Sequence, residues 1–206
     1  MDILKKYWDR YLYSAKYPEF SEEGFQFLLK KYREWGRFYH DETHLRELFG
    51  LFEVHIHTLK QPENIAVSIF FHDIVYNVLS KQNELESAEM ASKWLEKLGH
   101  VYPNVYGYIL ATKNHQNETE DTDLDYFLDF DLAVLGKSEE DYRNYFLATR
   151  KEYRIFPTFM YKKGRVQVLR HLLGLKSLYK TPTFRNSLEE QARKNMEAEI
   201  RFWEQK

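Results

Sequence analysis

The stretch PENIAVSIFFHDIVY, residues 62–76, joins the longest apolar run of the chain to an adjacent histidine and aspartate. Pro62 suits the first turn of a helix, where its missing N–H would have no helical partner in any case. We therefore expect a buried helix that carries Ala66–Val78, with His72 and Asp73 toward its end. Burying these two polar groups without partners would be costly. Either hydrogen bonds or an arginine satisfy the pair, or the pair binds a metal ion.

The rest of the chain also favours helices. Only 8 Gly and 5 Pro occur, and there is no long alternating run of β-branched residues. Apolar residues instead recur at steps of three and four. Helices are expected over residues 21–32, 43–59, 84–98, 103–113, 124–135, 138–155, 159–173 and 187–204, with Ser21 and Ser138 as N-caps and Gly99 and Gly136 at C-terminal ends. The predicted fold class is all-α.

The composition predicts one folded domain spanning residues 1–206. Hydrophobic residues make up 43% of the chain, which is enough to build a sizeable core. The 30 Lys and Arg nearly balance the 32 Asp and Glu, which argues against an extended nucleic-acid-binding surface. The absence of Cys excludes disulfides, thiolate zinc sites and a cysteine nucleophile. Any metal must therefore be held by nitrogen and oxygen ligands.

The first ten residues, MDILKKYWDR, lack the apolar segment of a signal peptide. The longest apolar run, Ile65–Phe71, is far shorter than the roughly 20 residues of a membrane-spanning helix. We therefore expect no membrane association and a cytoplasmic location.

Seven of the eight histidines fall between residues 40 and 115, in a segment that also carries Asp73. His40 and His44 are four residues apart, so on one helix their rings would project from the same face. Helices that offer two nitrogen ligands to a metal use this spacing. Downstream, Asp129 and Asp131 lie among apolar neighbours on an expected helix.

Six short blocks occur in a fixed order along the chain. They are RFYHDETH (residues 37–44), FHDIVY (71–76), NELESA (83–88), ATKNH (111–115), LDFDLAVLG (128–136) and ARKN (192–195). Together they resemble the HD superfamily of metal-dependent phosphohydrolases, and most closely a bacterial family of uncharacterised predicted phosphohydrolases. The resemblance covers about residues 37–195.

The resemblance implies an HD-type helical bundle whose central helices converge on a divalent metal held by His44, His72, Asp73 and Asp131. Two imidazoles and two carboxylates suit Mn²⁺, Fe²⁺, Co²⁺, Ni²⁺ or Zn²⁺ better than Mg²⁺. Asp73 would also contact the attacking water, whose pKa the metal lowers. The implied reaction is hydrolysis of a phosphate ester of a small molecule, a nucleotide being one candidate.

Several neighbouring roles stay open at this stage. His40 is either a ligand in place of His44 or a contact for the substrate phosphate. Asp129 would hydrogen-bond to a metal ligand and orient it, unless Asp129 is itself the ligand in place of Asp131. His115 is either a loop histidine or, together with His40, part of a second metal site.

Substrate contacts are expected from Arg37 and Lys113, whose charges would neutralise a phosphate unless both are ordinary surface cations. Glu84 is either the general base or an acid that stabilises a helix N-terminus. Tyr76 stands where some nucleotide-cleaving HD enzymes carry an acid, which counts against 5′-nucleotidase activity. The charged C-terminal helix is either a solvated face or a contact in a homo-oligomer.

Two other functions remain alternatives on the same scaffold. One is a di-iron oxygenase of HD type, for which His40 and His115 would complete the second iron site. The other is a regulatory module that binds a metal or nucleotide without turnover.

Overall fold

The structure, a computed structural model, describes residues 2–205 and contains α-helices and two short 3-10 helices, with no β-strand in that range. The expected all-α class is confirmed. By its internal contacts the chain forms two compact units, one ending at Phe127 and the other beginning at Leu128. The boundary falls inside α7 (Thr122–Leu132), so one helix contributes residues to both units. A single HD-type domain over residues 1–206 stays a prediction.

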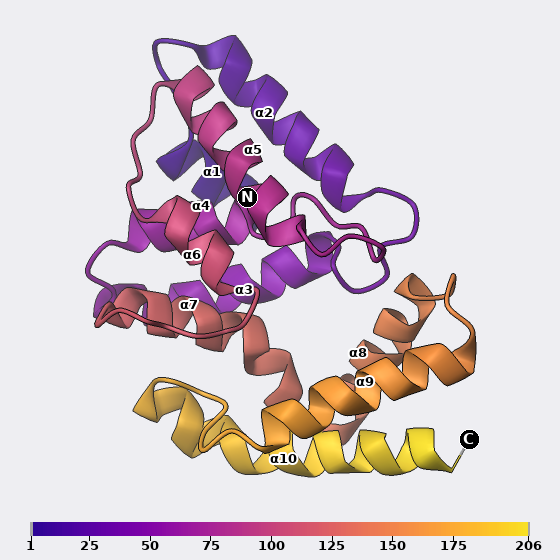
Figure 1. The fold of residues 1–206 in the computed structure, drawn as a ribbon. Coiled ribbons are helices and arrows are strands. Elements are labelled where there is room, and N and C mark those ends of the chain that lie inside the picture. Colours follow the sequence, from indigo (N-terminus) through magenta and orange to yellow (C-terminus); the bar gives the residue numbers. More distant parts are fainter. Residues whose placement is uncertain (1, 206) are drawn as a thin grey trace. The chain divides into compact units, whose positions relative to one another are not determined.

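The first unit is built around a helix that is buried on every side (Figure 1). This helix, α4 (Pro62–Phe71), is buried from Asn64 to its last residue, as expected for a helix that is apolar around most of its circumference. It packs against α1, α3, α5 and α6. The helices of this unit, besides α4 and the start of α7, are α1 (Ile3–Tyr11), α2 (Pro18–Tyr32), α3 (Glu42–His55), the 3-10 helix η1 (Ile56–Thr58), α5 (Asn83–Leu98) and α6 (Val105–Ala111).

The N-terminal helix α1 is an element that the sequence pattern did not predict. Asp2 caps it by accepting a hydrogen bond from the backbone N–H of Leu4. Its Trp8 is 1% exposed and lies against Phe25 and Phe70, with ring centroids 5.5 Å away in each case. The helix therefore belongs to the core of the first unit.

In this unit one expected helix end is confirmed, and two others lie at different residues. The C-terminal end at Gly99 is confirmed, since Gly99 adopts the left-handed conformation with φ of 73°. Ser21 is not a cap, because α2 begins three residues earlier at Pro18. The helix expected to reach Val78 ends at Phe71. Beyond it, carbonyls at 73 and 74 accept hydrogen bonds from a side chain, Arg37, instead of from a following helical turn.

The second unit contains the end of α7, a 3-10 helix and three longer helices. These are η2 (Ala133–Gly136), α8 (Glu139–Glu152), α9 (Thr158–Leu173) and α10 (Pro182–Glu204). Helices α9 and α10 run alongside each other (Figure 1). Ser138 caps α8 as expected, accepting from the N–H of Asp141. Helix α10 begins five residues before the expected start, because Thr181 caps it and Pro182 occupies its first turn.

Long-range polar contacts join α10 to the rest of this unit. Asn195 donates from its amide to the carbonyls of Leu135 and Lys137, which flank the turn after η2. Gly136 lies so close to α10 that a Cβ placed there would be 2.6 Å from the Cβ of Leu188. These contacts give Asn195, in the block ARKN, a structural role.

None of the helices within residues 2–205 is long and apolar enough to cross a membrane.

Candidate metal centre

His72 follows the last residue of α4, and its ring has a defined tautomer. The ring is 1% exposed, and its Nδ1 lies 3.0 Å from the carbonyl oxygen of Ile69. A carbonyl only accepts hydrogen bonds, so Nδ1 carries the proton. The lone pair of Nε2 is therefore available as a ligand, in the arrangement typical of metal-binding histidines.

His44 lies in the first turn of α3, and its ring approaches Nε2 of His72. Asp41 caps α3 by accepting from the N–H of Thr43, 2.7 Å away. The His44 ring is 2% exposed, and its Nε2 lies 3.3 Å from Nε2 of His72. Two helices distant in the sequence thus direct ring nitrogens to one buried point.

A carboxylate joins the two histidines. The Oδ2 of Asp73 is 3.3 Å from Nε2 of His72, and the Asp73 side chain is 20% exposed. His44, His72 and Asp73 thus bring two imidazoles and one carboxylate together within the first unit. Asp131, the fourth expected ligand, lies on the last turn of α7, in the second unit.

The separation of the two ring nitrogens fits two ligands of one cation. Ligand atoms about 2.1 Å from a tetrahedral or octahedral cation are separated by roughly 3.0–3.4 Å. The two Nε2 atoms, at 3.3 Å, have that separation.

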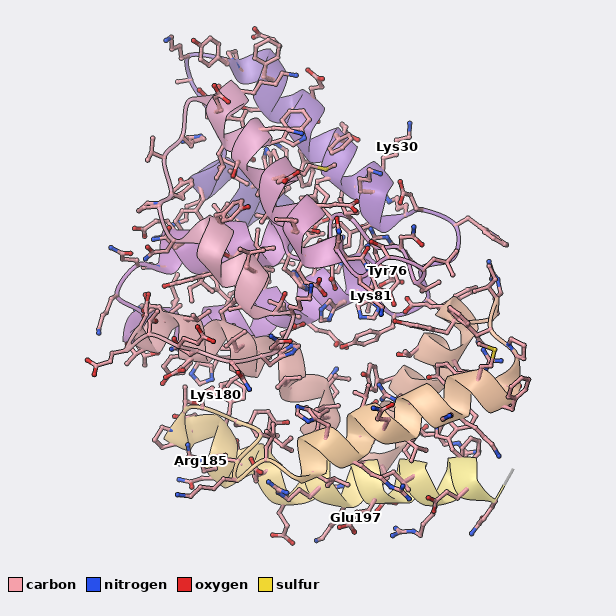
Figure 2. All side chains as sticks on the ribbon, in the orientation of Figure 1. Lys30, Tyr76, Lys81, Lys180, Arg185 and Glu197 are labelled. Atoms are coloured by element: carbon pink, nitrogen blue, oxygen red, sulfur yellow. The ribbon has the colours of Figure 1, made fainter. Side chains whose placement is uncertain are left out.

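His40 precedes α3, so it does not share a helix face with His44 as the four-residue spacing suggested. Its ring stacks on Tyr76 with centroids 4.3 Å apart, and its centroid is 5.9 Å from that of His44. Tyr76 and Lys81 lie on the segment between α4 and α5 (Figure 2). His40 is therefore close to the site, although it is not among the grouped ligands.

Arg37 was expected at the substrate, and its contacts are with the protein backbone. The residue is 9% exposed. Its terminal nitrogens donate to the carbonyls of His40, Asp73 and Ile74 at 2.7–3.0 Å. The guanidinium thus touches the backbone of a proposed ligand, Asp73.

The first turn of α5 is tied to the segment that follows Asp73. The hydroxyl of Ser87 accepts from the N–H of Val75 at 3.1 Å and donates to its carbonyl at 3.3 Å. Glu84 lies in this first turn and is partly buried. Sequence reasoning noticed the block NELESA and missed Ser87. The signal was a hydroxyl residue one position before Ala88 on the buried face of an amphipathic helix.

Lys113 and His115 lie after α6, which ends at Ala111 and not at residue 113 as expected. The ammonium of exposed Lys113 donates to the carbonyl of Lys81, 2.9 Å away. His115 has a positive φ of 48°, an uncommon conformation for a residue other than glycine. Within residues 2–205, neither Lys113 nor His115 is among the residues grouped as candidate metal ligands.

Asp129 was expected to orient a metal ligand, and the structure gives it other partners in the second unit. Its fully buried carboxylate accepts from the backbone N–H groups of Lys180 and Thr181 at 2.7 and 2.8 Å. Burial raises the pKa of Asp129, and these two hydrogen bonds oppose the rise. Lys180 and Arg185 mark the turn into α10 in Figure 2. Asp129 therefore fixes the start of that helix.

Comparison of the chain with protein-family models, with curated proteins and with solved structures gave no match.

Proposed function

We propose that this protein is a metal-dependent phosphohydrolase of HD type. His44, His72, Asp73 and Asp131 would hold one divalent transition-metal ion. The substrate would be a phosphate ester of a small molecule. The proposal combines the order of the sequence blocks with the approach of His44, His72 and Asp73.

The observation that carries the proposal is the approach of two buried imidazoles at their Nε2 atoms. Two neutral histidines can share one hydrogen bond between their Nε2 atoms. Such a bond would not explain why the Asp73 carboxylate lies beside one of these nitrogens. The carboxylate of Asp73, 3.3 Å from the same nitrogen, makes the point attractive to a cation. A cation is therefore a better fit than a purely structural histidine pair.

The residues of this chain would divide the work as follows. A bound cation supplies a water of lowered pKa and polarises a phosphoryl oxygen. Ile69 holds the His72 tautomer, so that Nε2 stays a ligand. Asp73 would accept the proton of the attacking water, and Glu84 is the second candidate for that proton. Lys113 would neutralise the phosphate as a point charge.

The test is the metal content per chain, measured by elemental analysis after purification without chelator, followed by a screen for phosphate release. We expect one equivalent of a transition metal in the wild type. His72→Ala and Asp73→Ala should lose it. His57→Ala is the matched control, because His57 is exposed and lies on η1, outside the grouped ligands. It should keep the metal and any phosphatase activity.

The same measurement separates the other functions. Two equivalents of iron without phosphate release would replace the proposal with the di-iron oxygenase. A retained metal with no turnover of any phosphate ester would indicate the regulatory module. A wild type that takes up none of Mn²⁺, Co²⁺, Ni²⁺ or Zn²⁺ would refute the metal site itself.

A further inference from the structure

We infer that Arg37 is a positioning residue: it sets the spacing of His44 and His72 by tying the backbone before α3 to the backbone after α4. The inference rests on the proposed metal site and assigns Arg37 a role different from substrate binding. It concerns residues of the first unit only.

The contacts of Arg37 bridge the two segments that carry the histidines. Nη1 donates to the carbonyl of His40 at 2.9 Å, just before the Asp41 cap of α3. The same nitrogen donates to the carbonyl of Asp73 at 2.7 Å, and Nη2 donates to that of Ile74 at 3.0 Å. One side chain thus connects the start of α3 to the two residues that follow His72.

The guanidinium also lies close to two aromatic rings. Its central carbon lies 4.9 Å from the ring centroid of Tyr32 and 5.4 Å from that of Tyr76. Tyr32 is itself fixed, because its hydroxyl donates to the carbonyl of Phe70 at the end of α4. Packing and hydrogen bonding therefore define the position of Arg37 closely.

These contacts replace the next helical turn. The carbonyls of Asp73 and Ile74 lie past the end of α4, and Arg37 satisfies both. A lysine would carry the same charge, but it cannot reach three carbonyls with a planar fork. From the other side, Ser87 holds Val75. The Asp73–Val75 backbone is thus anchored by two side chains, Ser87 from α5 and Arg37 from the segment before α3.

The test uses Co²⁺ as probe, titrated into metal-free protein and followed by visible absorption. The variant is Arg37→Lys, with Arg37→Gln as a second variant should the first lose its helical circular dichroism. Arg33→Lys is the matched control, because Arg33 is exposed and pairs with Glu42 on the surface. Urea unfolding of each metal-free protein reports the purely structural effect.

We expect the Arg37 variants to bind Co²⁺ about 10- to 100-fold more weakly than the wild type, as when a residue that orients ligands is lost. Their absorption bands should also shift, because the ligand geometry changes. Arg33→Lys should match the wild type. An unchanged affinity and spectrum in the Arg37 variants would overturn the inference, even if their unfolding midpoints fell. No Co²⁺ binding by the wild type would instead refute the proposed metal site, and the inference with it.

Discussion

Glu199→Gln should destabilise the second unit by several kcal/mol, because it neutralises a carboxylate at the centre of a buried network. Glu199 is 1% exposed and accepts hydrogen bonds from three side chains. The donors are the Tyr142 hydroxyl at 2.5 Å, Nε and Nη2 of Arg165 at 2.8 and 2.9 Å, and the Trp203 indole at 2.8 Å. The Arg165 side chain is itself only 12% exposed.

The magnitude follows from what the substitution leaves behind. Glutamine keeps the volume of Glu199, but its NH₂ group takes the place of a carboxylate oxygen that accepts hydrogen bonds. This NH₂ group then faces other hydrogen-bond donors. Arg165 then remains buried without a counter-charge. Removing one partner of a buried ion pair costs about 3–5 kcal/mol. A control on the same helix is Glu190→Gln, whose pair with Lys194 is exposed, so its unfolding midpoint should stay close to that of the wild type.

The assay is urea unfolding followed by far-ultraviolet circular dichroism. With a slope of about 2 kcal/mol/M, a cost of about 4 kcal/mol moves the midpoint by roughly 2 M. The double substitution Arg165→Met with Glu199→Leu should recover part of the loss, because it removes both charges together while the Tyr142 hydroxyl and the Trp203 indole lose their acceptor. A Glu199→Gln midpoint within about 0.5 M of the wild type would refute the assignment of a buried ion pair.

Three further outcomes are expected. Burial of Glu189 favours its neutral acid, but two backbone N–H groups and a guanidinium hold its pKa below the usual value. The Glu189 carboxylate therefore contributes to stability above pH 4.5, and this contribution is lost as the pH falls through the pKa of the folded state. The acid branch of a pH–stability curve should therefore be flatter in Glu189→Gln. Gly136→Ala should cost about 1–3 kcal/mol in urea unfolding, because the new Cβ meets Leu188. Ser87→Ala should cost about 1–2 kcal/mol by the same measurement, because the N–H and carbonyl of Val75 lose their partner.

Most helices could be predicted because their determinants are local. Apolar residues at steps of three and four marked the buried faces, and Gly99 and Ser138 marked helix ends through their own conformation or side chain. The helix α1 was missed although Asp2 is a good N-cap, because its nine residues present only a short apolar pattern.

The end of α4 could not be predicted in the same way. The apolar pattern continues through Ile74 and Val75, so the local signal favours a longer helix. The helix stops because Arg37 and Ser87, from distant segments, satisfy the backbone that follows. Tertiary hydrogen bonds thus overrode local propensity.

The candidate site divides along the same line. The sequence alone indicated a buried helix that carries His72 and Asp73 toward its end, and it supplied the order of His44, His72, Asp73 and Asp131 on which the proposed function rests. Only the tertiary structure decided that Nε2 of His44 lies 3.3 Å from Nε2 of His72, and that Asp129 serves the start of α10. Residue types and caps act over a single helical turn, so they are visible in the sequence. The distance between two rings depends on how helices pack, and long-range contacts such as those of Arg37 set that distance.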